Sequence, residues 1–499
     1  MKKSLALILA ALQLCFILAA CNDTQTPADT DPADVTNSQQ DAETTAPVDT
    51  DDLTEEERRA LIDDELPDDK KFGGRDFVIL STTSREKWYV VEEQTGVTQD
   101  DLVYRRNSTV ETDYDVNIAE ILYPDRHACR ATIQQALTSG DTEVFDLISY
   151  HMVDNAANAV AGHYLNWYEV PYVDFEKPWW PDTNMEDLTI NGKCFIAIGD
   201  VVIPSVRSTY CYTYNKQLAT DAGVEDLYQL VRDGKWTLDK SGEIIDQVYV
   251  DVNANGYSDV GDTFGLSGGL GSNLNTYLWA CDNSIIRNDE LGNPQYTYYT
   301  DKLPDIVSKV VELYTMKSST FSTTSRPECL AVFESGKALF IAGSLNDLMT
   351  ESAICDFACG VVPYPKFDEN QKEYRTMVDG GCDSMGISKI ESEDEIAFIG
   401  LITEALCAES YKQIYPTLYN SMLKGRYADM PEDAEMIDII VDGRLFDLGY
   451  VYDNWQGAGF WMETLVRSGN TNVTSYYESR WGGVENYYNT VLDIFYTEE

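Results

Sequence analysis

Val144-Phe145-Asp146-Leu147-Ile148 is a short apolar run of the length of a β-strand. The residues before it, 131–139, have the pattern of a helix that is closed by Gly140. Further upstream, Phe77-Val78-Ile79-Leu80 is a second apolar run of strand length. Buried strands that alternate with helices favour parallel sheets covered by helices on both faces. The stretch around residue 144 therefore predicts an α/β fold.

The same alternation continues toward the C-terminus. Residues 303–314 repeat apolar side chains at helical spacing, with Pro304 in the first turn. Residues 338–342 form another apolar run of strand length, which ends at Gly343. One face of a late predicted helix carries the apolar side chains Val484, Tyr487, Tyr488, Val491, Leu492 and Phe495. A body of this length is expected to form two or three domains.

The composition restricts the classes of partner. The chain has 85 acidic and 36 basic residues, for a formal net charge of -49. This balance argues against nucleic acid, because binding to it depends on Lys and Arg that neutralise phosphates. It also argues against peripheral binding to an anionic membrane surface. Apart from Cys15 and Cys21, the body has an odd number of cysteines without a C-x-x-C pair, so they do not predict a disulfide framework.

The N-terminus has the marks of an export signal. Lys2 and Lys3 precede an uncharged, mostly apolar run that ends in Leu18-Ala19-Ala20-Cys21. Residues 1–20 are therefore predicted to be a signal peptide. The last four residues resemble the bacterial lipobox, which implies cleavage before Cys21 and lipidation of its thiol; the alternative is an ordinary signal peptide with a chance cysteine. Residues 21–71 are predicted to be a disordered acidic linker that tethers the body outside the cell.

Five short motifs follow one another along the chain: Phe145-Asp146-Leu147-Ile148, Asn191-Gly192-Lys193, Tyr212-Thr213-Tyr214-Asn215-Lys216, Gly336-Lys337-Ala338-Leu339-Phe340 and residues 357–365. In this order they resemble the motifs of the extracellular solute-binding proteins, in particular the maltose-binding-protein group. Members of this family are the ligand-capturing subunits of ABC importers. The resemblance implies a two-lobed, type II periplasmic-binding-protein-like α/β fold, with a hinge and a ligand cleft between the lobes. It implies a first lobe at 72–205 plus 380–420 and a second at 206–375 plus 421–499.

The resemblance also implies which residues line the cleft. The implied ligand-binding residues are Tyr150, His151, Asn155, Arg207, Tyr210, Asp379 and Trp455, with Ser208, Asp383 and Trp461 beside them. Trp279 joins this set from composition alone. Ser208 stands where the maltose-binding group offers a carboxylate, so maltose itself is not implied. The chain's 32 Tyr and 9 Trp favour a carbohydrate ligand, because aromatic rings pack on sugar faces. A peptide is the alternative ligand.

Asp251-Val252-Asn253-Ala254-Asn255-Gly256-Tyr257-Ser258-Asp259-Val260-Gly261-Asp262 matches the 12-residue EF-hand loop at its ligand positions. The predicted calcium ligands are the side chains of Asp251, Asn253, Asn255, Asp259 and Asp262, and the carbonyl of Tyr257. The last position is Asp, not Glu, so its reach is shorter by one methylene. We expect a structural calcium ion; the alternative is a polar turn without metal.

The sequence predicts a binding protein without enzymatic activity. It has 3 His and contains no H-E-x-x-H, G-x-S-x-G or phosphate-cradling motif. Paired carboxylates would suffice for a glycosidase, so a cell-surface glycan-active enzyme is one alternative. A surface adhesin is another. The predicted partners are a small carbohydrate ligand, ABC permease subunits and, through the lipid anchor alone, the cell membrane.

Overall fold

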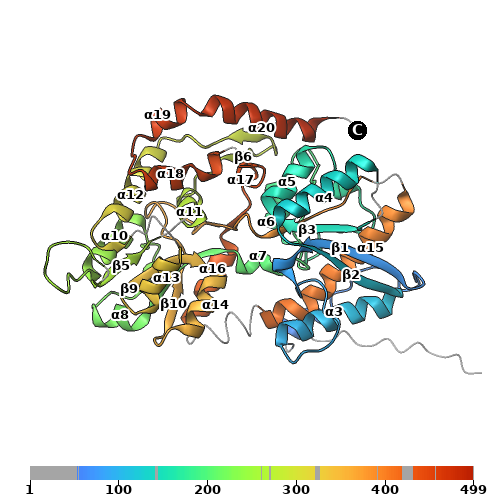
Figure 1. Ribbon diagram of the computed structural model, residues 1–499, viewed down its shortest axis with the longest axis horizontal. Helices are drawn as coiled ribbons and strands as arrows, with labels where there is room; N and C mark the ends of the chain where they lie inside the picture. The colour runs from blue at the N-terminus through green and yellow to red at the C-terminus, as the bar shows by residue number, and fades with distance from the viewer. Residues whose placement is uncertain are drawn as a thin grey trace, which may run out of the picture. The chain divides into compact units, whose positions relative to one another are not determined.

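The computed structural model describes residues 53, 55–140, 144–259, 261–268, 271–320, 326–389, 392–418, 431–455 and 457–497. The predicted signal peptide and Cys21 lie outside these residues. None of the helices in the described ranges is long and apolar enough to span a bilayer. The predicted α/β class is confirmed, because two separate sheets carry helices on their faces (Figure 1).

The first lobe is built on a four-stranded sheet in the order β12-β3-β1-β2. Its strands are β1 (Arg75–Thr82), β2 (Val116–Tyr123), β3 (Leu147–His151) and β12 (Asp383–Gly386). The strand β1 lies parallel to β2 and β3, whereas β12 runs antiparallel to β3. The helices of this lobe are α3 (Thr98–Tyr114), α4 (Arg126–Ser139), α5 (Met152–Val160), α6 (Asp182–Leu188) and α15 (Glu393–Glu409).

The second lobe is built on a five-stranded sheet in the order β10-β4-β9-β5-β8. Its strands are β4 (Tyr210–Asn215), β5 (Phe264–Ser267), β8 (Ser319–Thr320), β9 (Ala338–Ser344) and β10 (Cys359–Val362). Its helices are α8 (Lys216–Asp221), α9 (Leu227–Arg232), α10 (Leu238–Val248), α11 (Ser272–Ala280), α12 (Leu303–Thr315), α13 (Arg326–Glu334), α14 (Leu345–Ile354) and α16 (Pro431–Asp442).

Both sheets are mixed, which corrects the expectation of parallel sheets. The strand β4 is antiparallel to both of its neighbours, β9 and β10. The antiparallel strands β4 and β12 are the ones that enter a sheet directly from the junction between the lobes, and they therefore begin at the edge where the parallel strands end.

Three segments lie side by side at this junction. The first is the short helix α7 (Pro204–Arg207) with the residues that lead into β4, the second is β11 (Thr376–Met377), and the third is β13 (Arg444–Leu445). β11 pairs in parallel with β13, and Thr209 forms a bridge with Val378. The connection between the π-helical turn η4 (Ser410–Ile414) and α16 lies partly outside the described residues. The predicted lobe boundaries remain a prediction.

The predicted linker is ordered at its C-terminal end. Residues 55–60 form α2 (Glu55–Ala60), and the Arg59 guanidinium lies 4.5 Å from the centre of the Tyr411 ring. Leu66 is buried in the core of the first lobe, and Lys412 pairs with Asp64. The apolar side chains of this stretch give it surface to bury. The structured body therefore begins before residue 72.

The C-terminal helices α18 (Trp461–Arg467), α19 (Val473–Glu478) and α20 (Trp481–Tyr496) pack over both lobes. Figure 1 shows α20 running along the top of the molecule, beside the hairpin of β6 (Ile286–Asn288) and β7 (Pro294–Tyr296). Trp481, at the start of α20, packs edge-on against Tyr296. At its other end, Asn191 of the first lobe donates a hydrogen bond of 3.0 Å to the carbonyl of Phe495. This helix therefore connects the two lobes.

Candidate functional site

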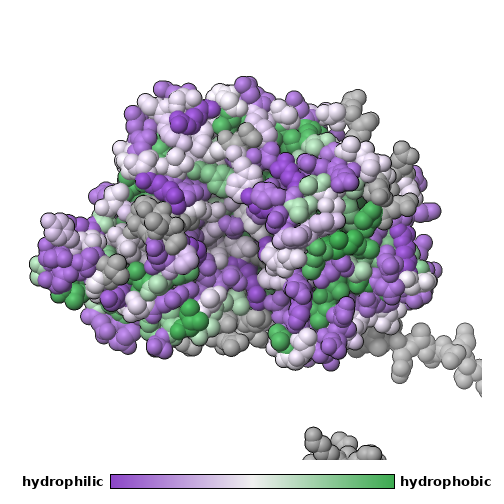
Figure 2. All heavy atoms as spheres, viewed as in Figure 1, coloured by the Kyte–Doolittle hydropathy of each residue, from purple (hydrophilic) through white to green (hydrophobic). Residues whose placement is uncertain are grey.

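A cavity of about 260 Å³ lies between the lobes, beside the junction segments. Its lining residues are Arg85, Trp88, Arg207, Ser208, Tyr210, Ser344, Asn346, Asp379 and Gly381. Figure 2 shows a mainly hydrophilic surface that is hollowed between the two halves of the molecule. Both lobes and the junction contribute side chains, so closing the lobes would enclose whatever the cavity holds.

The wall from the first lobe depends on a buried carboxylate. The Arg85 guanidinium Nε lies 3.0 and 3.1 Å from the two carboxylate oxygens of Asp383. The Tyr89 hydroxyl donates to the same carboxylate at 2.8 Å. Burial lowers the pKa of Arg85, but the charge of Asp383, its hydrogen bond and the neighbouring Tyr89 and Cys382 together outweigh burial, so the pKa lies above its usual value. Arg85 therefore stays charged and fixed in place, while Asp383, which is 1% exposed, lies behind it.

The floor of the cavity is tied together by Asp379. Its carboxylate accepts hydrogen bonds from the Tyr210 hydroxyl and, at 2.7 Å, from the Gly381 amide. Its own amide donates to the Ser208 carbonyl at 2.9 Å. The Gly380 amide donates to the hydroxyl of Tyr450 at 2.9 Å. One carboxylate thus links two of the junction segments.

Trp88 provides the aromatic surface of the cavity. The guanidinium carbons of Arg207 and Arg85 lie 5.3 and 5.8 Å from its ring centre. The loop that carries Trp88 is fixed by its neighbour Tyr89, whose carbonyl accepts hydrogen bonds from the buried side chains of Arg106 and Asn107, at 2.6 and 2.9 Å. The sequence analysis missed Arg85 and Trp88. Their position just after a predicted parallel strand could have indicated them, because ligands bind at the carboxyl ends of such strands.

A second aromatic group adjoins the cavity. The His151 ring lies 5.8 Å from that of Trp455, and its Cδ2 lies about 4 Å from where a Cβ of Gly381 would be. Trp455 is 46% exposed and stacks on Phe460, with ring centres 4.9 Å apart. The Arg126 guanidinium lies 4.6 Å from its ring centre. Burial lowers the pKa of His151, so this imidazole is neutral at physiological pH. His151 therefore lies close to Gly381 of the cavity, and Trp455 lies next to His151, although neither residue is among those that line the cavity.

Arg207, Tyr210 and Asp379, three of the predicted ligand-binding residues, thus lie together at the cavity, and their role in binding stays a prediction. Three other predicted ligand residues do not reach it in this structure. Tyr150 is buried and its hydroxyl accepts from Asn158 at 2.8 Å.

The other two are buried in a similar way. The Asn155 amide is buried and donates to the Ser384 carbonyl at 2.6 Å. Trp279 is buried in the second lobe, where its Nε1 donates to Asp447 at 2.8 Å. Trp461 is also buried, packed edge-on against Tyr298. Polar atoms that are satisfied inside a lobe have no need of a ligand.

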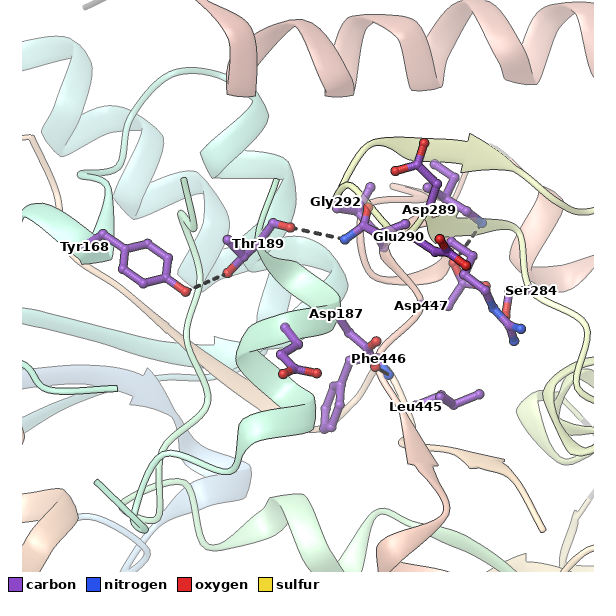
Figure 3. Close-up of a pocket in the computed structure, with 15 residues that line it drawn as sticks. Tyr168, Asp187, Thr189, Ser284, Asp289, Glu290, Gly292, Leu445, Phe446 and Asp447 are labelled. Carbon is purple, nitrogen blue, oxygen red and sulfur yellow. Dashed lines mark hydrogen bonds between the residues drawn. The ribbon is translucent and has the colours of Figure 1, made fainter. Parts of the chain in front are cut away.

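A second cavity, of about 550 Å³, lies between α6, the β6–β7 hairpin and the segment after β13 (Figure 3). Asp187 on one side accepts a hydrogen bond of 3.0 Å from the Phe446 amide, and burial raises its pKa to about 6. The hairpin side carries Asp289 and Glu290. Asn288 reaches across and donates to the Thr189 carbonyl at 3.3 Å. This cavity is acidic and lies beside a different junction segment from the first.

The predicted calcium loop is folded on itself. The side-chain amides of Asn253 and Asn255 lie 2.9 and 2.8 Å from one Asp259 carboxylate oxygen. The Asp251 carboxylate accepts from the Gly256 amide at 2.7 Å, and the buried Asp262 carboxylate accepts from the Asp259 amide at 3.0 Å. Among the described residues, no group of three or more His, Cys, Asp or Glu side chains is arranged to hold a metal ion.

Comparison with known proteins gives structural likeness without sequence likeness. No protein-family model and no curated protein matches the chain. A cyclic α-maltosyl-1,6-maltose binding protein from Arthrobacter globiformis superposes with a TM-score of 0.53 at 14% identity, covering 85% of this chain and 99% of its own. A cyclo/maltodextrin-binding protein complexed with maltotetraose superposes with a TM-score of 0.53 at 13% identity, covering 85% of this chain and 97% of its own.

UgpB from Mycobacterium tuberculosis, solved with glycerophosphocholine, gives a TM-score of 0.54 at 15% identity, covering 85% of this chain and 99% of its own. These likenesses span nearly the whole of each relative. The chain therefore has the two-lobed, type II fold of the ABC-importer substrate-binding proteins.

Proposed function

We propose that this protein captures an oligosaccharide and delivers it to an ABC importer without altering it chemically. The observation that carries the proposal is the cavity between the lobes, to which both lobes and the junction contribute polar and aromatic side chains. Hinge bending would bury the ligand there, and the closed shape would be the form that a permease recognises. The likeness in fold supports this proposal.

The side chains around the cavity favour a sugar over a peptide. Trp88 lines the cavity with its indole ring, and Trp455 exposes a second indole ring beyond His151. Ser208, Asn346 and Asp379 provide hydroxyl, amide and carboxylate groups for sugar hydroxyls. A peptide receptor of the same architecture is the second candidate. The mycobacterial structure contains glycerophosphocholine, so proteins of this fold bind ligands other than sugars.

A binding role without turnover agrees with the state of the two carboxylates near the cavity. Asp383 is buried and paired with Arg85, and Asp379 accepts hydrogen bonds from Tyr210 and Gly381. Both carboxylates thus have structural partners. Incubation with candidate glycans, followed by chromatography, tests the enzymatic alternative: any product formed in proportion to the protein would contradict a pure binding role.

A thermal-shift screen over mono- and oligosaccharides and short peptides tests the proposed function. A ligand at 100 times its dissociation constant stabilises the folded protein by about 2.7 kcal/mol. Small-angle scattering with the best ligand should show a smaller radius of gyration. Trp88→Ala should weaken binding at least tenfold, whereas Tyr496→Ala, at an exposed aromatic residue far along α20, should not change it. Unchanged binding by the Trp88 variant would place the ligand elsewhere.

We also propose that the mature protein is a lipoprotein, anchored at Cys21 on the outer face of the cell membrane. The sequence Leu18-Ala19-Ala20-Cys21 after an apolar run supports this. The wild-type protein should partition into detergent, and Cys21→Ala should release it into the aqueous phase. A wild-type protein that stays aqueous would show that residues 1–20 are an ordinary signal peptide.

We further propose that residues 251–262 bind a structural calcium ion. The support is the spacing of the oxygen-bearing side chains and their approach to one another, since Asn253 and Asn255 both lie against Asp259. A flip of either amide would direct an oxygen toward the same centre. Calorimetric titration with CaCl₂ should show one site that Asp251→Asn abolishes. Absence of heat at millimolar calcium would leave the loop as a polar turn.

A further inference from the structure

The cavity between the lobes is less acidic than the protein as a whole. The chain has a net charge of -49, whereas the charged side chains among the described residues that line the cavity are Arg85, Arg207 and Asp379. The carboxylate of Asp383 is 1% exposed and lies behind Arg85. We propose, on the basis of the proposed sugar-binding function, that the ligand is an acidic oligosaccharide whose uronic acid carboxylate binds at Arg207 and Arg85.

The arrangement around Trp88 suits a carboxylate. A guanidinium group that packs on an indole ring makes that contact with its flat face. Its N–H groups then point outward in the guanidinium plane, away from the ring. Those N–H groups match the two oxygens of a carboxylate. Two such groups, with carbons 5.3 and 5.8 Å from the ring centre, lie at Trp88. Arg85 already donates from Nε to Asp383 and from Nη2 to the Gly381 carbonyl, so its Nη1 is the nitrogen left to meet an anion. Hydroxyl and amide groups that suit the rest of a sugar ring lie beside it.

The donors are held in place before a ligand arrives. Arg85 is fixed by Asp383, and its loop is fixed at the Tyr89 carbonyl by two buried side chains. Arg207 belongs to α7, at the start of the junction between the lobes. Donors on a fixed loop and at the hinge need little reordering, which favours binding and lets closure of the lobes bring them together on one carboxylate.

An arginine that packs on an indole ring and pairs with a buried carboxylate is found a second time, at Trp455. Arg126 lies 4.6 Å from the centre of the Trp455 ring, and Arg126 and Arg130 share the buried carboxylate of Asp154, at 2.5 and 3.4 Å. Asp154 is 1% exposed, so the two arginines present more charge to solvent than it does. His151 connects this group to the cavity. A second acidic unit of a longer ligand would find a similar environment there.

Calorimetric titration with matched ligands tests the inference. The probes are α-1,4-trigalacturonate and an aldotetraouronic acid, each compared with its neutral methyl ester. We expect at least one acid to bind at least tenfold more tightly than its ester in 20 mM NaCl, with the difference shrinking in 300 mM NaCl because salt screens the charges. Arg207→Gln should reduce the affinity for the acid at least tenfold more than the affinity for the ester. Arg207→Lys should reduce the affinity for the acid less than Arg207→Gln does.

The control is Arg232→Gln, at a surface arginine paired with Glu435 and outside the cavity, which should leave both affinities unchanged. Circular dichroism and melting curves establish that each variant folds. Should esters or neutral maltodextrins bind as tightly as the acids, or should neither acid bind at millimolar concentration while neutral sugars do, the inference is overturned and the proposed function stands. Binding of short peptides with no sugar bound would overturn both.

Discussion

At the scale of single residues, burial decides which suitable side chains can meet a ligand. Trp279, Tyr150 and Asn155 are of types that bind sugars well, yet each uses its polar atom on a neighbour within its own lobe. Arg85 and Trp88, which the sequence analysis did not single out, line the cavity. Residue type can be read from a sequence, but the partner that satisfies a buried polar atom comes from distant segments, such as residue 447 for residue 279.

Asp447 shows that one buried side chain can accept hydrogen bonds from several segments that are distant in sequence. Its buried carboxylate accepts from the Trp279 indole at 2.8 Å, from the backbone amides of Ile285 and Ile286 at 2.5 and 3.1 Å, and from the Gly449 amide at 2.8 Å. In Asp447→Asn, an amide NH₂ replaces one acceptor, so donors would face donors. We expect a loss of roughly 2–5 kcal/mol in the free energy of unfolding, measured by urea denaturation.

Asp289→Asn is the matched control, because this exposed carboxylate caps backbone amides in the β6–β7 hairpin, where water can replace it. It should cost less than about 1 kcal/mol. Equal stability of the two variants would contradict the assignment of Asp447 as the acceptor that holds residues 279–286 and 449 together.

At the scale of elements, the junction depends on close packing more than on flexible backbone. A Cβ on Gly380 would lie 2.7 Å from Val153 Cγ2 and 2.8 Å from the Tyr450 hydroxyl. Gly380→Ala should therefore lower the free energy of unfolding by about 1–3 kcal/mol, and calorimetry should show weaker ligand binding as the junction shifts. Contact with Val153 of α5 is thus a reason for glycine at position 380.

Gly482→Ala is the control for this substitution. It lies in the first turn of α20, and a Cβ there would meet nothing within 4 Å. Alanine favours a helix over glycine by about 0.5–1 kcal/mol, so this variant should be slightly more stable than the wild type. A Gly380→Ala protein as stable as Gly482→Ala would show that the junction accommodates a side chain.

The helix α20 should hold the first lobe through its last turn. Phe495 is fully buried and lies 5.3 Å, between ring centres, from Phe195. Phe495→Ala should cost about 3–5 kcal/mol, because it removes a buried aromatic ring and leaves a cavity. Hydrogen exchange followed by mass spectrometry should show faster exchange around residues 191–195. Faster exchange confined to the second lobe would contradict this connection.

At the scale of the whole molecule, buried carboxyl groups predict a stability maximum at mildly acidic pH. Burial raises the pKa values of Asp146 and Asp187 to about 6, of Glu120, Glu351 and Glu404 to about 7, and of Asp200 to about 8. Between the unfolded pKa values of about 4 and these folded values, the folded protein binds more protons. Its free energy of unfolding should therefore rise as the pH falls from 8 to 5.5.

Burial lowers the pKa values of His151 and His163, which acts in the opposite direction, but six carboxyl groups outnumber two imidazoles. Urea denaturation at pH 5.5 and 8, in 0.3 M NaCl to screen surface repulsion, measures the effect. Greater stability at pH 8 would mean that these groups ionise freely in the folded protein.

The two-lobed α/β architecture could be predicted from the sequence because it rests on local apolar runs and on the order of short motifs. The mixed direction of the sheets could not, since it depends on where the chain re-enters each lobe. The start of the body was also misplaced: Leu66 is buried although it lies in an acidic stretch, and Arg59 packs on the ring of Tyr411 in η4, which is far away in sequence.

The placement of β12 next to β3 has a consequence for biosynthesis. The first sheet is completed by Asp383–Gly386, which the ribosome makes long after the other three strands. A nascent chain therefore carries an open strand edge at β3 while residues 152–382 are being made. The first sheet cannot be completed during that time, so assembly of the first lobe is delayed until most of the second lobe has been synthesised.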